Sequence, residues 1–283
     1  MIEASRAPTI LSSKRIFWVV ASVIILLFLI ANLPWQLDDY DQAKQAFTSF
    51  EMIKEGRWFY QQTPREHVAT KPPLVGWLSA GLFSLTRSWD VAWRLPSLLA
   101  AIAISIRLFR AASLAYGTTA AVIALSAFGL NLLSPRLATL VRTDMPLAFV
   151  IFLIGLLIWW KIHKEDAWST NDQFFIFALL TAAMLIKGPI VYAFLLPGIA
   201  LFQWSTWRGH GRARPLGASR TARWLQGAWF GWWPWVASLG IFLLWVIGGI
   251  LSQSGFFDEV VMREFIGRFG ETIHRPQPLY FYL

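Results

Sequence analysis

The sequence predicts an all-α fold, a polytopic membrane helical bundle, on three observations. Of its 283 residues, 56% are apolar and 17 are tryptophan, and the mean hydropathy is +0.51. The apolar residues recur in long runs, and the basic residues cluster beside these runs. One soluble core could not bury so much apolar surface, whereas a lipid bilayer can cover it. We therefore expect about seven membrane spans, with interfacial helices in an outer loop.

The first apolar run, residues 16–34, predicts an uncleaved first span, because no small-residue cleavage site follows it. Arg6, Lys14 and Arg15 precede this run. Positively charged segments are retained on the cytoplasmic side of a membrane. The N-terminus is therefore expected in the cytoplasm and residues 35–71 outside.

Basic clusters further along the chain assign the remaining apolar segments to the two sides of the membrane. Arg107 and Arg110, the group at 161–164 and the arginine-rich segment 205–225 are all expected in the cytoplasm. The assignment is free of conflict if six further segments span the membrane: 92–113, 117–134, 145–162, 173–186, 189–204 and 228–251. The segment 205–225 is then a basic cytoplasmic loop.

The apolar segment 72–86 does not fit this alternation as a span. It begins with two prolines and carries Trp77, and Trp89 follows its end. These features are typical of a helix that lies at the membrane surface. We expect such an interfacial helix within a first outer loop at 35–91, and the alternative is a short, tilted span that violates one charge rule.

Four polar segments are then expected on the outer face of the membrane: 35–91, 134–144, 187–188 and 252–283. Ionisable side chains near lipid are costly and are usually retained for function. These segments are therefore the place to look for a functional site.

The first outer loop holds three candidate residues. Apolar residues at helical spacing predict a helix over 41–56, with Gly56 placed to end it. Asp41 stands at the start, where it could simply cap the helix, and Lys44 lies one turn on, where it could pair with Asp41. Lys71 precedes two prolines that hold the backbone rigidly, although interfacial lysines also snorkel.

The other outer segments supply five more candidates. Arg142 and Asp144 precede the span that begins at residue 145, and they could either neutralise each other or act on a substrate. Lys187 lies in a turn that needs only the glycine and proline that follow it. His274 and Tyr282 close the chain beside other aromatic residues, which an interfacial aromatic belt would also explain.

Cations beside carboxylates suit the transfer of a group from a lipid-linked phosphate. Lys71, Arg142 and Lys187 could bind the phosphate and stabilise its charge as it leaves. Asp41 could accept a proton from an attacking hydroxyl or amine. Asp144 could position Arg142 or the acceptor.

The chain resembles the integral-membrane GT-C glycosyltransferases, and it is similar to the bacterial aminoarabinose (lipid A) transferases and the dolichyl-phosphate-mannose protein mannosyltransferases. The resemblance covers nearly the whole chain. The motifs that carry it are Asp41-Gln42, Lys44, Glu51-Met52, Gly56, Trp58, Lys71-Pro-Pro-Leu74, Arg142-Thr-Asp144, Lys187-Gly-Pro189 and His274 to Tyr282.

This resemblance implies transfer of a sugar from a polyprenyl-phosphate donor to a lipid, glycan or protein acceptor, with inversion at the sugar carbon. It places the enzyme in the bacterial inner membrane among membrane lipids, with the site facing the periplasm. Catalytic roles fall on Asp41 and Asp144. Substrate-binding roles fall on Lys44, Lys71, Arg142, Lys187, His274 and Tyr282.

The chain departs from the family in two respects. Many members have Asp-Glu where this chain has Asp41-Gln42, and Asp38 and Asp39 lie nearby at an offset that does not match. Such enzymes also continue with further spans and often a soluble outer domain. Residues 1–283 are therefore expected to form a GT-C catalytic module without those parts, and a fragment, one part of a split protein and a minimal form all remain open.

Several ligand classes are not expected. The chain contains no cysteine, which excludes disulfides and thiolate metal sites. Its net charge of +9 lies beside apolar segments, so we expect no nucleic-acid partner. Because cations are plentiful and carboxylates few, phosphate charge can be met without metal, and we expect no cofactor. A divalent metal remains the alternative.

Two other classes of protein compete with the enzyme. A lipid-phosphate transporter would show polar groups in its span centres and repeated halves, but the centre of the segment 145–162 is almost wholly apolar. A non-catalytic membrane subunit would tolerate changes at Asp41 apart from their effect on stability. The glycosyltransferase is the preferred hypothesis.

Overall fold

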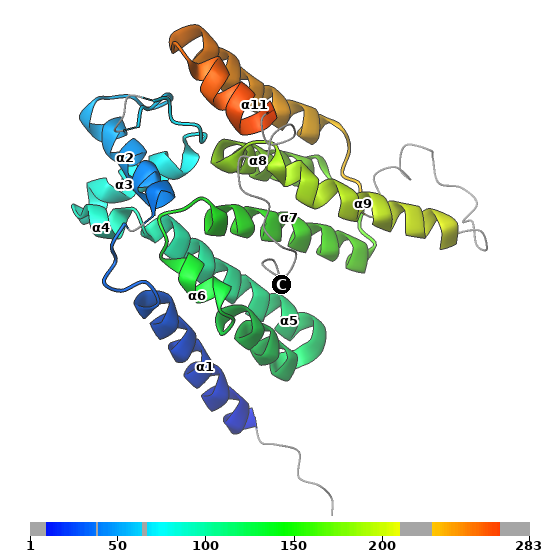
Figure 1. The fold of residues 1–283 in the computed structure, drawn as a ribbon. Helices are drawn as coiled ribbons and strands as arrows, with labels where there is room; N and C mark the ends of the chain where they lie inside the picture. The colour runs from blue at the N-terminus through cyan, green and yellow to red at the C-terminus, as the bar shows by residue number, and fades with distance from the viewer. Residues whose placement is uncertain (1–9, 38, 64–66, 210–227, 267–283) are drawn as a thin grey trace, which may run out of the picture. The chain divides into compact units, whose positions relative to one another are not determined.

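A computed structural model describes residues 10–37, 39–63, 67–209 and 228–266 (Figure 1). His274, Tyr282 and most of the predicted loop 205–225 lie outside the described residues. The described elements are α1 (Ile10–Ile30), α2 (Tyr40–Lys54), α3 (Leu74–Thr86), α4 (Trp89–Ala92), α5 (Leu95–Gly129), α6 (Leu133–Ala138), α7 (Asp144–Lys164), α8 (Thr170–Lys187), α9 (Ile190–Gly209), α11 (Trp233–Ser252) and the π-helix η1 (Phe257–Ile266). Within these residues there is no named strand, so the predicted all-α class is confirmed.

The described chain has the helices of a multi-pass membrane protein. Three helical stretches are long and apolar enough to cross a bilayer: Trp89–Gly129, Asp144–Lys164 and Trp233–Ser252. Shorter apolar helices cover Arg15–Ile30, Leu74–Thr86 and Ile190–Ser205. The 13 residues of α3 rise only about 20 Å, less than the bilayer core of about 30 Å. The count of seven spans and the interfacial position of 72–86 remain predictions.

The chain divides into two compact units. The first unit comprises Met1–Ala46 and Leu78–Leu153, and the second comprises Phe47–Trp77 and Ile154–Leu283. Each unit has its own packing, and each is described by itself.

In the first unit, α1 packs against α5 and α6. Helix α5 reverses direction at Gly117, whose φ of 86° lies in the left-handed region that glycine adopts without strain. In a straight helix Ala101 and Leu125 would lie about 36 Å apart, yet both belong to one buried cluster with Ile24 of α1. The two predicted segments 92–113 and 117–134 are therefore the two arms of this helical hairpin.

Gly129 allows α1 to approach the second arm of α5. A Cβ atom at this position would lie 2.5 Å from Cδ1 of the buried Ile24, so a larger residue cannot fit without a shift. We expect Gly129→Ala to lower the stability of the protein by about 1–3 kcal/mol through overpacking. The measurement is the unfolding midpoint in detergent, with unfolding monitored by tryptophan fluorescence.

Gly155 of α7 provides the matched control for this prediction. A Cβ atom there meets no other atom within 4 Å. Gly155→Ala is therefore expected to be neutral or to stabilise the helix by up to about 1 kcal/mol. Equal midpoints for the two alanine variants would contradict the proposed close packing at Gly129.

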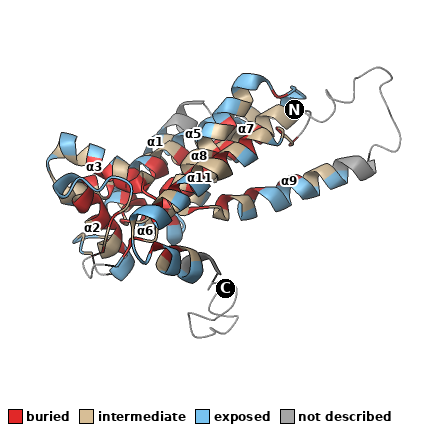
Figure 2. Cartoon of the chain, turned by 90° about the horizontal axis from the view of Figure 1, so that it is seen from above, coloured by how far each residue is buried: buried red, intermediate tan, exposed pale blue. Residues whose placement is uncertain are grey.

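In the second unit, α8 packs against α11 and α9. One face of α8 is buried, and the indole of Trp233 in α11 donates a hydrogen bond of 2.9 Å to Gln173 of α8. Tyr192 of α9 donates to the carbonyl oxygen of Trp235 at 2.5 Å. Helix α9 also carries exposed apolar side chains, including Phe194 and Leu201, and is largely tan and pale blue in Figure 2. Such a surface suits contact with lipid.

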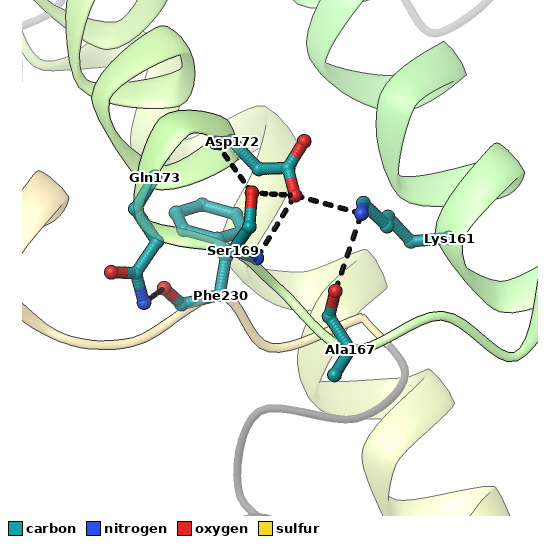
Figure 3. A network of polar contacts seen from close by, with 6 residues as sticks. All are labelled: Lys161, Ala167, Ser169, Asp172, Gln173 and Phe230. Carbon is teal, nitrogen blue, oxygen red and sulfur yellow. Dashed lines mark hydrogen bonds and ion pairs between the residues drawn. The ribbon is translucent and has the colours of Figure 1, made fainter.

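The turn between α7 and α8 is held by a polar network, shown in Figure 3. Lys161 forms an ion pair of 2.7 Å with Asp172 and donates to the carbonyl oxygen of Ala167. Ser169 and Asp172 complete a capping box at the start of α8, which satisfies backbone N–H groups that a helix start leaves unpaired. Gln173 donates to the carbonyl oxygen of Phe230 and so ties the segment before α11 to α8.

Candidate functional site

Two carboxylates and one guanidinium group meet at the start of α2 in the first unit. Nη2 of Arg142 donates to the carboxylate of Asp39, and the same nitrogen lies 3.8 Å from Oδ2 of Asp41. All three side chains are partly exposed, with 31% of Arg142, 42% of Asp39 and 51% of Asp41 accessible. The structure thus joins the predicted Asp41 and Arg142 into one charged cluster and adds Asp39 to it.

Asp39 holds this position because it caps α2. Its Oδ1 accepts a hydrogen bond of 3.1 Å from the backbone N–H of Asp41, as the cap residue of a helix does. The sequence had made Asp41 the candidate cap, and that assignment is wrong by two residues. Because Asp39 supplies the cap, the carboxylate of Asp41 is not needed for that role.

The surroundings of Gln42 account for an amide at the position where many members of the family have a glutamate. Its side chain is only 6% exposed, and its Oε1 accepts a hydrogen bond of 3.3 Å from the backbone N–H of Val141. A neutral amide can fill this buried position without the cost of burying a charge. The contact fixes α2 to the loop that carries Arg142.

The same loop is tied to α1 and α5. Ser97 of α5 donates to the carbonyl oxygen of Leu140 at 2.8 Å, and Asn32, just after α1, donates to Oγ1 of Thr139 at 2.7 Å. Thr139 in turn donates to the carbonyl oxygen of Phe28. Backbone anchored on several sides leaves Arg142 little freedom to move away from the start of α2.

Two further predicted residues belong to the first unit. Asp144 begins α7, where the helix dipole favours a carboxylate. Lys44 lies in α2, one turn after Asp41. The roles assigned to Asp144 and Lys44 remain predictions.

The second unit contains the two predicted phosphate-binding lysines. Lys71 follows a turn in which the N–H of Ala69 donates to the carbonyl oxygen of Gln61, and it is half-buried. Lys187 is the last residue of α8 and is followed by Gly188, whose φ of 73° ends the helix. A lysine in the last turn also complements the helix dipole. Phosphate binding by Lys71 and Lys187 remains a prediction.

Glu51 is an additional buried ionisable residue in the second unit. It is 6% exposed, its Oε1 lies 2.9 Å from Nη1 of Arg57, and its Oε2 accepts from the N–H of Gln62. These groups line a cavity of about 290 Å³ together with Phe47, Phe50, Lys54, Glu55 and Thr63. Sequence analysis named Glu51 only as part of the family resemblance. Its spacing of four residues from Phe47 places both residues on the same side of α2.

Burial raises the pKa of Glu51 above its ordinary value of 4.5, although the Gln62 N–H and the Arg57 guanidinium oppose the rise. Between the ordinary and the raised pKa, the folded protein binds more protons than the unfolded chain. The stability contributed by this carboxyl group therefore falls as the pH rises through that window.

This pH dependence can be tested with Glu51→Gln, which does not titrate. We expect the unfolding midpoint of the native protein, measured relative to that of the variant, to fall as the pH rises from below 4.5 to neutrality. Tryptophan fluorescence in detergent at a series of pH values gives both midpoints. If the midpoint of the native protein relative to that of the variant stays constant or rises with pH, burial does not raise the pKa of Glu51.

The segment that follows α2 packs against α11. Tyr60 donates to the carbonyl oxygen of Trp245 at 3.0 Å, and the indole of Trp245 donates back to the carbonyl oxygen of Phe59. At the other end of the loop, the indole of Trp77 donates to the carbonyl oxygen of Trp58. The loop in the second unit is therefore a packed structure.

Within the described ranges, no group of three or more carboxylate and histidine side chains is arranged to hold a metal ion. The arginine and lysine residues beside the carboxylates supply positive charge of their own. Independence from metals and cofactors remains a prediction.

Comparison with known proteins relates this geometry to one family. The sequence model of the family described as dolichyl-phosphate-mannose-protein mannosyltransferase matches residues 70–214, about half of the chain. The match includes Lys71, Arg142, Asp144 and Lys187. No protein of the curated collection matches.

Two solved structures share the fold. ArnT from Cupriavidus metallidurans bound to undecaprenyl phosphate is 21% identical, with a TM-score of 0.64 over 91% of this chain and 45% of that chain. The apo form of the same protein gives a TM-score of 0.53 over 94% of this chain. The chain thus spans about half the length of ArnT and has the GT-C-like helical fold. On the family match, this chain belongs to the dolichyl-phosphate-mannose-protein mannosyltransferase family.

Proposed function

We propose that this chain is a glycosyltransferase module that transfers a sugar from a polyprenyl-phosphate donor to an acceptor outside the cytoplasm. The observation that carries the proposal is the cluster at the start of α2, where a half-exposed carboxylate, Asp41, lies 3.8 Å from the guanidinium of Arg142. The family supports a transferase. The fold neighbour bound to undecaprenyl phosphate supports a polyprenyl-phosphate lipid as the donor.

In the proposed reaction, Asp41 acts as the general base. It accepts the proton of the acceptor hydroxyl or amine as that group attacks the anomeric carbon of the sugar. A bond forms between the acceptor and the anomeric carbon, and the bond from this carbon to the phosphate oxygen breaks. The electron pair leaves on the polyprenyl phosphate, and the configuration at the sugar carbon inverts.

Lys71 and Lys187 are assigned to the phosphate of the donor. Their ammonium groups favour the negative charge that builds up on the phosphate as it leaves. Lys44, His274 and Tyr282 are assigned to substrate binding on the family resemblance. Arg142 is assigned to contribute positive charge for the donor, and Asp144 to position Arg142 or the acceptor. The sugar is a hexose or a pentose, and the acceptor is a lipid, a glycan or a protein. We assign the protein to the bacterial inner membrane, with its site facing the periplasm.

Binding of the donor lipid is the first test of this assignment. A ligand that binds only the folded protein raises its stability, by about 2.7 kcal/mol at one hundred times the dissociation constant. We expect undecaprenyl phosphate to raise the unfolding midpoint of the purified chain in detergent. Undecaprenol, which lacks the phosphate, should raise it much less.

Equal midpoints with the two lipids would contradict a phosphate-directed donor site. Clear stabilisation by undecaprenyl phosphate without any sugar transfer would instead support a non-catalytic subunit that binds the lipid. The transporter hypothesis would require movement of the lipid between the leaflets of a proteoliposome.

A further inference from the structure

We infer that Asp39 is a positioning residue of the transfer reaction, which engages Arg142 and thereby keeps the carboxylate of Asp41 available as the base. The inference rests on the proposed function and deepens it. Sequence analysis did not make Asp39 a candidate, because its position relative to Asp41 does not match that of the family's second acidic residue.

The contacts of Arg142 distinguish the two carboxylates. One nitrogen of its guanidinium donates directly to Asp39 but stands 3.8 Å from Asp41. A charge-assisted hydrogen bond occupies acceptor capacity of the carboxylate and makes it a weaker base. The direct bond to Asp39 therefore spares Asp41, the more exposed of the two.

Asp39 is itself fixed in place. Its Oδ1 caps α2 through the N–H of Asp41, while its Oδ2 accepts from Arg142. The carboxylate thus links the first turn of α2 to the loop before α7. Nε of Arg142 is buried and has no hydrogen-bond partner within the described residues, so this side chain is held in place by the contacts of Nη2 with the two carboxylates.

Removal of the charge at Asp39 would change the partner of Arg142. The loop that carries Arg142 is anchored to α2 by the Val141 N–H and to α5 by Ser97, so the guanidinium stays near the start of α2. The guanidinium then still has the carboxylate of Asp41 at 3.8 Å. Lys44 of α2 and Asp144 at the start of α7 are charged residues close in sequence to the cluster, and both are kept in every variant used to test the inference.

Asp39→Asn isolates the charge, because asparagine caps a helix as well as aspartate does. We expect this variant to lower kcat for sugar transfer by about tenfold, the effect of a poorly placed general base, with little change in the KM for the donor. Asp90→Asn is the control, since Asp90 is a 73% exposed carboxylate of the same unit on α4. It should leave kcat unchanged.

A second substitution separates positioning from a merely structural role. If Arg142 captures Asp41 in the Asp39→Asn protein, then Arg142→Gln should lower kcat by a smaller factor in Asp39→Asn than in the native protein, because it also releases Asp41 there. A merely structural role for Asp39 predicts that Arg142→Gln lowers kcat by the same factor, or a larger one, in Asp39→Asn. That result, or full activity of Asp39→Asn, would overturn the inference.

A stability measurement tests the same inference without activity. The coupling between Asp41 and Arg142 is measured by a double-mutant cycle of Asp41→Asn and Arg142→Gln, using unfolding midpoints in detergent. The cycle is carried out once with Asp39 present and once with Asp39→Asn. We expect a larger coupling without the Asp39 charge, and an equal or smaller coupling would overturn the inference. A native protein without transfer activity would count against the proposed function, whereas the cycle would still decide the role of Asp39.

Discussion

Replacing Asp41 by asparagine is expected to lower the rate of sugar transfer by about 10²- to 10⁴-fold, the usual contribution of a general base. The amide has nearly the same shape as the carboxylate but cannot accept the acceptor's proton. Because Asp39 caps α2, the substitution removes no cap from the helix. Transfer of radiolabelled sugar by membranes that contain equal amounts of each protein gives the two rates.

Two controls make the Asp41 result specific. Asp41→Asn should still be stabilised by undecaprenyl phosphate, because the donor phosphate is assigned to other residues. Asp90→Asn removes a carboxylate from the same unit and should keep the native rate. Full transfer by Asp41→Asn in a correctly inserted protein would refute the assignment of Asp41 as the base.

Lys71→Ala is expected to have the second large effect, on the donor phosphate. Loss of one group that stabilises developing negative charge costs about 10²- to 10³-fold in kcat. The variant should also lose most of the stabilisation by undecaprenyl phosphate, because the ammonium attracts the phosphate before the reaction begins. Both quantities are measured on the same protein preparation, and the same pattern is expected for Lys187→Ala.

Lys164→Ala is the matched control for the lysine variants. Lys164 lies in the last turn of α7 and stacks its ammonium over the ring of Trp160 at 5.2 Å. Its removal changes the net charge by the same amount without touching a proposed phosphate ligand. If Lys164→Ala and Lys71→Ala weakened lipid binding equally, general electrostatic attraction would explain the effect, and a phosphate site at Lys71 would be excluded.

Local patterns in the sequence predicted much of the fold. The helix predicted over 41–56 is found as α2, Tyr40–Lys54, because its apolar spacing and the glycine after it are both local signals. The two segments 92–113 and 117–134 are found as the arms of α5, since Gly117 marks the reversal between them. Hydrophobic periodicity and glycine conformation act over one or two turns of chain, so they can be read from sequence.

Less of the site could be predicted from the sequence, because the site depends on contacts between residues that are far apart in the chain. The place of Asp39 in the site depends on a contact with Arg142, 103 residues further along the chain, which no local pattern contains. The identity of the capping residue was missed because several acidic residues lie within one turn of the start of α2. The burial of Glu51 likewise depends on the return of the loop at Arg57 and Gln62.

Coupled measurement of both products tests the transferase most directly. A polyprenyl-phosphate donor that carries a radiolabelled sugar is incubated with membranes containing the native protein or Asp41→Asn. We expect the native protein to move label into the acceptor fraction and to release polyprenyl phosphate in equal amount, and Asp41→Asn to do neither at a comparable rate. Label that stays on the prenyl lipid with the native protein, or equal transfer by both proteins, would contradict the account.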